Sequence, residues 1–368
     1  MGYSIKYLAS GLFLLFLLFI NACTSRAPRT VSFESIPKID LHAHIFPDIP
    51  EFVDWVSINK LKLMNIAVAG TDPIKLLYMD KQSRLLMQKY PRQFAYCTTF
   101  DLTGIRDARY VENVKTWLDS AFVHGASMVK IWKEIGMEIK DKEGNYILPD
   151  DPLFDPIYDH ISKNKKVLIA HLADPKEAWE PLDSNNVYYN YYQNNKQWHF
   201  FGKLGVPSYE AIILAMENIL TKHPALTFVG AHLCNLSHDI DEIARRLDRF
   251  PNLYIENSAR TAYLARQPTE KVRNFILKYQ DRFLYGSDYA INYNNEDGEY
   301  LYSYKKPDDI RQAVDFADTV YRRDFGYFAN SGPYLYLRFK TEALNLPKPV
   351  LEKIFFKNAQ KIIFKTAL

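Results

Sequence analysis

The chain has 368 residues, of which 48% are hydrophobic and 15% are aromatic, and its formal net charge is +3. This composition provides enough apolar side chains for a large core, and the length fits either one large barrel domain or two smaller domains. Because the net charge is small and no basic block carries interleaved aromatic residues, we expect no nucleic-acid partner.

The first 22 residues are predicted to be a lipoprotein signal peptide. They carry one charge, Lys6, followed by an apolar run at 12–20 and by small residues before Cys23. The run is shorter than the roughly 20 apolar residues of a membrane-spanning helix, and this order of segments is typical of a secretory signal. Because the segment resembles a bacterial lipoprotein signal, we predict lipidation of Cys23, export, and anchoring at the periplasmic or outer-membrane face. The alternatives are an ordinary export signal cut nearby and an uncleaved anchor, and residues 23–35 are expected to form a tether.

The chain has few cysteines for an exported protein. Besides Cys23, only Cys97 and Cys234 are present. They fall on the third and sixth predicted strands, which lie apart around a barrel, so we expect no disulfide.

Eight short, β-rich apolar segments recur along the chain, and each is followed by a longer stretch with helical periodicity. The predicted strands lie at 37–43, 64–69, 94–100, 126–131, 167–171, 226–232, 253–257 and 283–287. Amphipathic helices are predicted at 73–90 and 239–250, where apolar residues recur at helical spacing. The alternation predicts parallel βα units. Eight such units predict an α/β domain over residues 36–368, a closed (β/α)8 TIM-type barrel with C-terminal helices.

Two segments are longer than the connections of a barrel require. Residues 174–206 follow the fifth predicted strand and residues 289–337 follow the eighth, and both are rich in aromatic residues. Loops of this length are usually functional or disordered, and the aromatic content disfavours disorder. Both segments leave the carboxyl ends of strands, where barrel enzymes build their sites.

Side chains that can bind a metal ion occur at the ends of several predicted strands. They are His42 and His44 on the first strand, Lys130 on the fourth, His171 on the fifth, His232 on the sixth, and Asp288 after the eighth. Taken singly, each has an ordinary explanation, such as a chance pair of histidines or a rim salt bridge. Because the carboxyl ends of barrel strands meet on one face, we expect these side chains to lie together. Imidazole and carboxylate ligands suit Zn²⁺, so the joint pattern predicts a metal site.

The alternation of side chains along a strand sets the expected orientation of the first pair. Residues two apart share a face, so His42 and His44 are predicted to point together into the barrel mouth, with Asp40 behind them. Asp40 is then either an acceptor that orients a ligand imidazole or only a residue at the start of the strand.

The segments IDLHAH, VKIW, VLIAH, FVGAHL and LYGSDY occur in this order along the chain. In these segments and their order, residues 36–365 resemble the metal-dependent amidohydrolase superfamily, in the branch of uncharacterised amidohydrolases and non-oxidative decarboxylases. The resemblance implies the metal-dependent hydrolase barrel with one or two divalent ions, for which we expect Zn²⁺. It also implies that His42, His44 and Asp288 bind the first ion.

The same resemblance leaves alternatives for the other candidate ligands. It implies that His171 is a third histidine ligand, shared or not according to how many ions bind. His232 is either a ligand of a second ion or a catalytic group that polarises the substrate. Lys130 is either a carbamylated bridge between two ions or a lysine with another role.

The ligand set implies a hydrolytic mechanism. Zn²⁺ lowers the pKa of a bound water towards about 7. Asp288 is expected to take the proton and pass it to the leaving group, and His232 to stabilise charge that develops on the carbonyl oxygen. We therefore expect cleavage of a C–N or C–O bond in a small amide, cyclic amide, ester or lactone. The alternatives are a decarboxylase of an aromatic or unsaturated acid and a surface lipoprotein that binds metal without turnover.

Substrate contacts are expected from the loops around the barrel mouth. Asn257 and Arg260 follow the seventh strand, Trp132 follows the fourth, and Trp198 belongs to the 174–206 segment. Arg260 is expected either to clamp a substrate carboxylate in a bidentate pair or to form a structural ion pair.

The 174–206 segment also carries a cluster of ring side chains. Its members are Tyr188, Tyr189, Tyr191, Tyr192, Trp198 and His199. This cluster is expected either to form a lid or wall of the site or to be a small core that holds its own loop together.

Overall fold

The computed structural model describes residues 31–291 and 310–365, which belong to one compact unit, Val31–Leu368. The predicted signal peptide, Cys23 and the first part of the tether lie outside the described residues. Among the residues within these ranges, no helix is long and apolar enough to cross a membrane.

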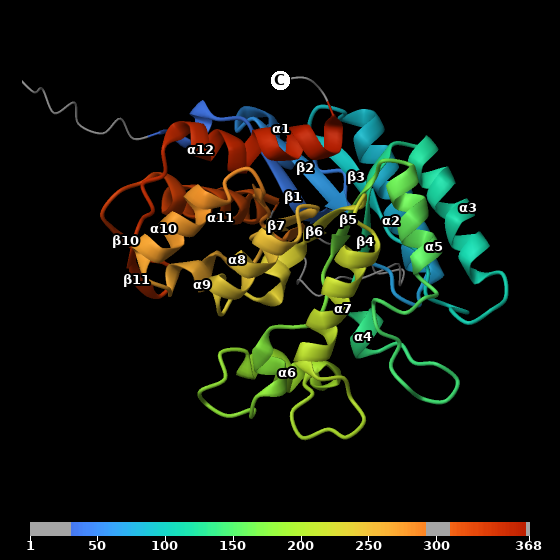
Figure 1. The fold of residues 1–368 in the computed structure, drawn as a ribbon. Coiled ribbons are helices and arrows are strands. Elements are labelled where there is room, and N and C mark those ends of the chain that lie inside the picture. The colour runs from blue at the N-terminus through green and yellow to red at the C-terminus, as the bar shows by residue number, and fades with distance from the viewer. Residues whose placement is uncertain (1–30, 292–309, 366–368) are drawn as a thin grey trace, which may run out of the picture. The chain divides into compact units, whose positions relative to one another are not determined.

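A parallel β-sheet forms the centre of this unit (Figure 1). Its strands occur in the order β8-β7-β6-β5-β4-β3-β2-β1-β9. They are β1 (Lys38–Ile45), β2 (Leu61–Ile66), β3 (Phe94–Thr98), β4 (Ala126–Ile131), β5 (Val167–Ala170), β6 (Thr227–Gly230), β7 (Leu253–Glu256), β8 (Phe283–Leu284) and β9 (Tyr289–Ile291). All eight predicted strands are present, and the second begins and ends three residues earlier than predicted.

The last predicted strand is divided into two pieces, and this division closes the barrel. β8 pairs with β7, whereas β9 pairs with β1 at the other edge of the sheet. Between them, the Leu41 N–H donates to Tyr285 O at 2.9 Å and the Asp288 N–H donates to His42 O at 2.7 Å. The connection from β8 to β9 therefore joins both edges of the sheet, and the fold is the predicted (β/α)8 TIM-type barrel.

Helices follow most strands and cover the outside of the barrel (Figure 1). The α-helices are α1 (Pro50–Ile58), α2 (Pro73–Lys89), α3 (Tyr110–Val123), α4 (Glu134–Met137), α5 (Asp155–Lys163), α6 (Tyr189–Asn194), α7 (Tyr209–Lys222), α8 (Ile240–Arg249), α9 (Thr261–Ala265), α10 (Thr269–Lys278), α11 (Ile310–Ala329) and α12 (Lys348–Glu352). The predicted helices at 73–90 and 239–250 correspond to α2 and α8. Each begins at an aspartate, Asp72 or Asp239, whose side chain accepts a backbone N–H of the first turn.

Shorter helical turns complete the chain. They are η1 (Phe33–Ser35), η2 (Lys176–Trp179), η3 (Lys196–Trp198), η4 (Ala231–Asn235), η5 (Lys353–Lys357) and η6 (Gln360–Phe364). A separate antiparallel hairpin is formed by β10 (Pro333–Tyr336) and β11 (Phe339–Glu342).

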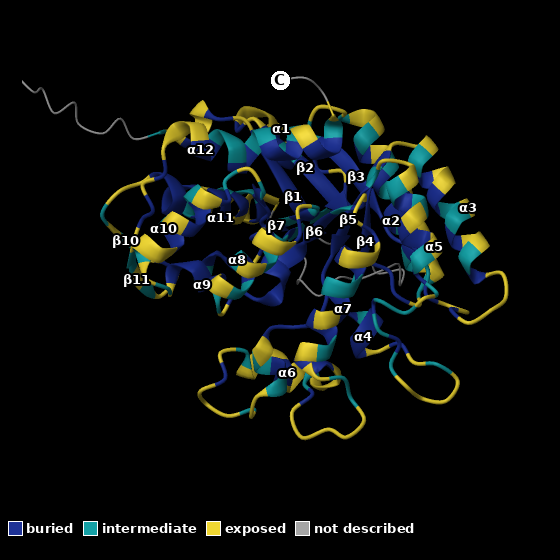
Figure 2. Ribbon diagram, viewed as in Figure 1, coloured by how far each residue is buried: buried dark blue, intermediate teal, exposed yellow. Residues whose placement is uncertain are grey.

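Two hydrophobic layers lie on the two faces of the curled sheet, whose strands are buried (Figure 2). The inner layer takes alternate residues of the strands, among them Ile39 and Leu41 of β1, and η6 continues it. The outer layer packs the other strand face against the helices. Cys97 belongs to the inner layer and Cys234 to the outer one, and both are free thiols.

β1 changes the direction of its side chains partway along its length. Its pairing with β2 shifts register between Asp40 and Ala43, and an extra residue in a strand reverses the alternation that follows it. Ile39 and Leu41 therefore belong to the inner layer, whereas Ala43 and Ile45 belong to the outer one. This shift turns the intervening histidines toward the interior at the carboxyl end of β1.

The shift also removes Asp40 from the position that the simple alternation predicted. Its carboxylate accepts hydrogen bonds from the backbone N–H of His42 at 2.9 Å and from the hydroxyl of Tyr321 on α11. Of the two predicted roles of Asp40, these contacts support that of a residue near the start of the strand, because its carboxylate bonds to donors other than a ligand imidazole.

The segment 174–206 forms a cap near the carboxyl ends of the strands and contains η2, α6 and η3. In Figure 1 the cap lies below the barrel, on the side opposite to α12. Its outer turns are exposed (Figure 2), whereas Tyr192 and Trp198 within it are buried. Of the other long segment, 289–337, residues 292–309 lie outside the described part of the chain.

Candidate metal centre

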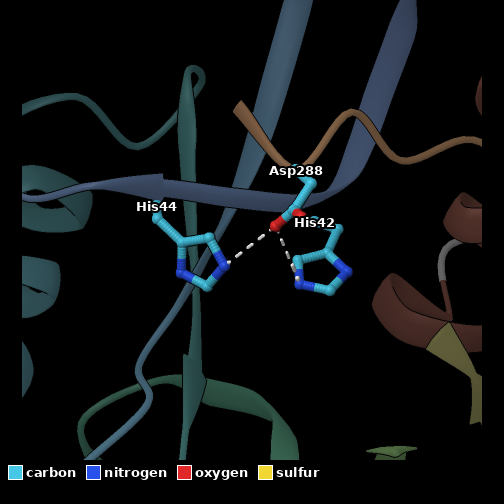
Figure 3. Close-up of side chains that lie close together, drawn as sticks. All are labelled: His42, His44 and Asp288. Carbon is cyan, nitrogen blue, oxygen red and sulfur yellow. Dashed lines mark ion pairs between the residues drawn. The ribbon is translucent and has the colours of Figure 1, made fainter. Parts of the chain in front are cut away.

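His42, His44 and Asp288 gather at the carboxyl end of β1 (Figure 3). Oδ1 of Asp288 lies 3.6 Å from His42 Nε2 and 3.3 Å from His44 Nε2. The three possible ligand atoms all lie within 4.8 Å of one another. Asp288 adopts a left-handed backbone with φ of +63° in the β8–β9 connection. The divided last strand thus places a carboxylate between the two imidazoles.

Hydrogen bonds on the far side of each ring determine which nitrogen carries the proton. His42 Nδ1 lies 2.8 Å from Glu256 Oε1, and His44 Nδ1 lies 2.8 Å from Ile66 O. Both partners are acceptors, so each Nδ1 carries the proton and each Nε2 turns a lone pair toward Asp288. Burial and the charge of Lys130 lower the pKa of His42, which favours its neutral ring. Three lone-pair atoms therefore converge, and this arrangement fits a divalent cation.

Glu256, the last residue of β7, is a site residue that was not predicted. Its fully buried carboxylate accepts from His42, from the Ser258 hydroxyl at 2.8 Å and from the His232 N–H at 3.1 Å. Burial by itself would raise the pKa of Glu256, but the interactions with His42 outweigh it, and the pKa is lowered to about 2. The ionised carboxylate therefore fixes the orientation and the tautomer of the His42 ring.

Glycine at position 286 makes room for this carboxylate. A Cβ atom there would lie 2.6 Å from Glu256 Oε2 and 3.0 Å from the Cβ of His42. The glycine in the segment LYGSDY is thus required by the close approach of the divided strand to the carboxylate.

His171 and His232 lie beside one another in the same cavity. His232 Nδ1 lies 2.8 Å from the carbonyl oxygen of Ser258, so this nitrogen carries the proton of the ring. His171 Nδ1 accepts the indole N–H of Trp132 at 3.1 Å. His232 Nε2 nevertheless lies only 3.1 Å from His171 Nδ1. Burial and the charge of Arg260 lower the pKa of His232 to about 3, which disfavours a proton shared between the two rings.

The backbone that carries His232 is strained. Four consecutive non-glycine residues, 232–235, have φ between +54° and +58°, and a left-handed conformation costs roughly 1–2 kcal/mol per residue. The turn is held by the bond from the His232 N–H to Glu256 and by Asn235, whose Nδ2 donates to Leu172 O at 2.8 Å. Strain maintained by its surroundings is typical of functional sites, and here it aims an imidazole at His171.

Lys130 lies beside both groups on β4. Its Nζ is 3.3 Å from His42 Nε2, and its charge contributes to the lowered pKa of His171 after burial and His232. Burial lowers the pKa of Lys130 itself to about 8. A substantial fraction of this amine is therefore neutral near pH 8, which is the form that can act as a nucleophile or a ligand.

A cavity of about 340 Å³ opens at these residues. Its lining includes all six of the predicted metal ligands: His42, His44, Lys130, His171, His232 and Asp288. Asp288 is accessible over 33% of its side chain, whereas that of His42 is only 2% exposed. The cavity therefore has direct access to the carboxylate.

The predicted substrate-binding residues fall in three positions. Arg260 and Trp132 line the cavity. Trp198 lies behind Trp132, with ring centroids 5.5 Å apart. Asn257 is buried and donates to Thr261 Oγ1 at 2.8 Å, and it is not among the described residues that line the cavity.

The aromatic cluster of the cap combines both of its predicted roles. Tyr188, Tyr191 and Tyr192 line the cavity. Tyr192 is also fully buried and packs on His199 with ring centroids 5.4 Å apart. One side of the cluster is therefore a wall of the cavity, and the other side is a core of the cap.

The barrel, with imidazole and carboxylate groups at the carboxyl ends of its strands, defines the class of TIM-barrel proteins with a candidate metal centre. A family model described as amidohydrolase matches residues 39–364. The chain therefore belongs to the amidohydrolase family. Among curated protein sequences, no significant match to this chain is found.

Solved structures share the fold of the chain. A 2,6-dihydroxybenzoate decarboxylase from Rhizobium has 13% sequence identity and a TM-score of 0.51, over 90% of this chain and 99% of that chain. A 2,6-dihydroxybenzoate decarboxylase complexed with 2,6-dihydroxybenzoate has 13% identity and a TM-score of 0.52, over 89% and 99%. An amidohydrolase II has 16% identity and a TM-score of 0.50, over 89% and 99%. At these identities, the likeness concerns the fold.

Proposed function

We propose that the protein is a metal-dependent hydrolase that uses water to cleave a C–N or C–O bond of a small amide, ester or lactone. The observation that carries the proposal is the convergence of His42 Nε2, His44 Nε2 and Asp288 Oδ1 beside a cavity that reaches the carboxylate. Membership of the amidohydrolase family supports it.

The lone-pair atoms suggest which residues would hold metal ions. His42, His44 and Asp288 would hold the first divalent ion. His171 and His232 would hold a second, and Lys130 lies next to His42, with its Nζ 3.3 Å from His42 Nε2. We propose Zn²⁺, which suits imidazole and carboxylate donors. A bound ion would polarise a substrate carbonyl and lower the pKa of water.

The chain's own groups would then move the proton and orient the ligands. Asp288 would accept a proton from the attacking water and return it to the leaving group, since its side chain is open to the cavity. His232 keeps its proton on Nδ1 at the Ser258 carbonyl, so its Nε2 presents a lone pair to the site. This supports the role of ligand over that of a donor to the substrate carbonyl.

Metal content together with a substrate screen tests the proposal. Protein purified after growth with zinc should contain about one or two equivalents of metal, and His42→Asn should lose most of it. His160→Asn is the matched control, because His160 lies on the surface of α5 and pairs with Asp119. A pooled screen of amides, esters and lactones should yield a metal-dependent product. Metal-free protein after such growth, or metal-loaded protein inert to the whole pool, would contradict the proposal.

A decarboxylase of an aromatic or unsaturated acid is the second candidate. The observation that favours it is the aromatic wall of the cavity, to which Trp132, Tyr188 and Tyr191 contribute. Two of the proteins that share the fold are, by name, decarboxylases of a hydroxylated benzoate. Carboxylic acids in the same screen distinguish the two reactions, because decarboxylation releases CO₂ and hydrolysis releases an amine, alcohol or hydroxy acid.

We also propose that the protein is exported and anchored to a membrane through a lipid on Cys23. The order of charge, apolar run and cysteine in residues 1–23 supports this. Metabolic labelling with palmitate should mark the native chain and not Cys23→Ala. An unlabelled native chain that remains in the soluble fraction would contradict the proposal.

A further inference from the structure

The β10–β11 hairpin carries two exposed leucines. Leu335 and Leu337 are 62% and 53% exposed, although Tyr336 between them is buried. The pairing of Tyr336 with Phe339 leaves Leu337 and Arg338 as a two-residue turn. Leu337 there has a φ of +54°, a conformation for which such turns normally use glycine, asparagine or aspartate. The packing of the hairpin does not explain a leucine held in this conformation and open to water.

Basic side chains lie beside these leucines. Arg338 occupies the turn, and Lys340 lies across the hairpin from the first leucine. With Arg266 of the α9–α10 connection, they line an open groove of about 590 Å³, in which Glu342 is the one acidic residue among the described lining residues. Both guanidinium groups lie over the ring of Phe339, at 5.2 and 5.3 Å from its centre. The hairpin therefore combines exposed apolar side chains with a net positive charge.

The three cations of the groove differ from other basic residues on the surface. Among the ion pairs of residues 31–291 and 310–365, none involves Arg266, Arg338 or Lys340. Lys271 on the neighbouring α10, by contrast, lies 2.8 Å from Asp241. Charges that the chain does not neutralise give this face a positive potential, which attracts an anionic partner.

The hairpin also lies close to the point at which the described chain begins. η1 packs on α11, where the rings of Phe33 and Phe325 have centroids 5.4 Å apart. β10 packs on α11 as well, because the Tyr334 hydroxyl donates to Arg323 O at 2.7 Å. In Figure 1, the blue start of the described chain and the hairpin both lie toward the left. Cys23 lies eight residues before the start of this unit, and a chain of that length spans at most about 28 Å.

We propose that the outer face of the hairpin docks on the surface of an anionic phospholipid bilayer. This docking face consists of Leu335, Leu337, Arg338, Lys340 and Arg266. The leucines enter the boundary between headgroups and acyl chains, and the cations bind the lipid phosphates. The inference rests on the proposed lipid anchor, because a short tether to the membrane raises the effective concentration of lipid at a small surface.

A fluorescent label on the hairpin tests the inference on the full chain. Leu335→Cys is labelled with an environment-sensitive dye, and the lipidated protein is reconstituted in phosphatidylglycerol vesicles that contain a spin-labelled quenching lipid. The dye reacts at this position, because Cys97 and Cys234 are buried and the lipid occupies Cys23. We expect the quenching lipid to lower the fluorescence of the dye. An unquenched dye on anchored protein would overturn the inference.

Leu204→Cys is the matched control. Leu204 belongs to the cap, is 99% exposed and follows Lys203, so it shares the apolar and basic character of the hairpin. Because the docking face does not include the cap, the dye at this position should remain unquenched in the same vesicles. Equal quenching at both positions would show contact with lipid that is not specific to the hairpin, and it would overturn the inference.

Replacement of the cations tests the contribution of charge. In labelled Leu335→Cys, addition of Arg338→Gln and Lys340→Gln should lower the ratio of docked to undocked chains about fivefold for each cation removed. Lys115→Gln on α3 is the control, because Lys115 pairs with Glu112 outside the docking face. Phosphatidylcholine vesicles, which carry no net charge, should also quench the dye less. Quenching that depends neither on these cations nor on the charge of the lipid would overturn the inference.

Further results separate the inference from its alternatives. A change in the fluorescence of the Leu335→Cys dye with protein concentration, in the absence of vesicles, would indicate a second copy of the chain on the hairpin and would overturn the inference. A chain that palmitate labels but whose dye is unquenched would contradict only the docking. If palmitate does not label the native chain, Cys23→Ala with labelled Leu335→Cys still tests the hairpin. Quenching of that dye by phosphatidylglycerol vesicles would then contradict only the proposed anchor.

Discussion

Two carboxylates lie on either side of His42, and their surroundings are opposite. Asp40 receives hydrogen bonds from the N–H groups of His42 and Ser287, from the Ser287 hydroxyl at 2.5 Å, and from the Tyr321 hydroxyl. Asp288 instead faces the lone pairs of two imidazoles at 3.3 and 3.6 Å. In the first region, hydrogen-bond donors surround one acceptor. In the second, two ring nitrogens and a carboxylate oxygen converge, with the amine of Lys130 3.3 Å from His42 Nε2.

This difference in surroundings distinguishes a structural polar group from a functional one in this barrel. Buried polar groups are normally satisfied by partners within the protein, and Asp40 meets that rule. Around Asp288, the Nε2 atoms of His42 and His44 converge on one carboxylate oxygen beside the cavity, an arrangement that fits a cation.

The strongest test of the comparison is Asp288→Asn. We expect turnover of the substrate found in the pooled screen to fall by about 10³-fold, because the variant loses a ligand and the proposed base. Thermal stability of the metal-free protein should stay close to that of the native chain, because Asn fits the same space. A variant with native turnover would remove Asp288 from the mechanism and end the contrast with Asp40.

Asp40→Ala should produce the reverse pattern. Its removal leaves four buried donor groups without their acceptor, so we expect the free energy of unfolding to fall by roughly 3–4 kcal/mol. Urea denaturation measures the loss, with Asp48→Ala as the control, because Asp48 pairs with Lys89 at the surface. A loss no larger than that of the control would show that the donors are satisfied without Asp40.

The barrel and its ligand positions could be predicted from the sequence because both depend on local signals. Apolar β-rich segments that end in His44, His171 and His232 each indicate a strand, and the histidine marks the carboxyl end of that strand. The division of the last strand into β8 and β9 could not be predicted, since it depends on pairing with two different neighbours.

The contacts of Asp40 and of Asn257 depend on details of strand geometry that the sequence does not show. The position predicted for Asp40 assumed regular alternation along the first strand, but a register shift in β1 moves Asp40 to another set of partners. At the end of β7, Asn257 was predicted to contact substrate, although the adjacent Glu256 is the residue that contacts His42. An acidic residue at the end of a predicted strand was the available signal, and which of two neighbours faces the site depends on register.

Glu256 accepts a hydrogen bond from His42, the residue that contacts both Asp40 and Asp288, so replacing Glu256 tests the comparison of these two carboxylates further. Glu256→Gln keeps the shape but removes the charge that fixes the His42 tautomer, so zinc affinity should fall about tenfold to hundredfold. Competition with a chromogenic chelator measures the affinity, and Glu242→Gln on the surface of α8 is the control. An unchanged affinity would mean that the His42 ring is oriented by other contacts, among which Ser258 Oγ at 2.9 Å is the nearest candidate.

Asp324 extends the comparison to pH, with a smaller effect. This buried carboxylate accepts from the hydroxyls of Tyr336 at 2.5 Å and Tyr285 at 3.1 Å, yet burial raises its pKa to about 6. The folded chain therefore keeps a proton that the unfolded chain has already released, and this group lowers stability as pH rises from about 4 to 6. Relative to the native chain, Asp324→Asn should gain roughly 2 kcal/mol in the free energy of unfolding between pH 4 and pH 7.

Urea denaturation of both chains at the two pH values gives this difference, and any loss of metal at low pH affects both chains alike. A difference that does not change with pH would mean that the two hydroxyl donors keep Asp324 ionised despite its burial. The hydrogen-bond donors around a buried carboxylate in this barrel would then by themselves determine whether it is ionised. In that case, the difference between Asp40 and Asp288 would be due entirely to the neighbouring atoms, which are hydrogen-bond donors for Asp40 and ring nitrogens for Asp288. The depth at which each carboxylate is buried would not contribute.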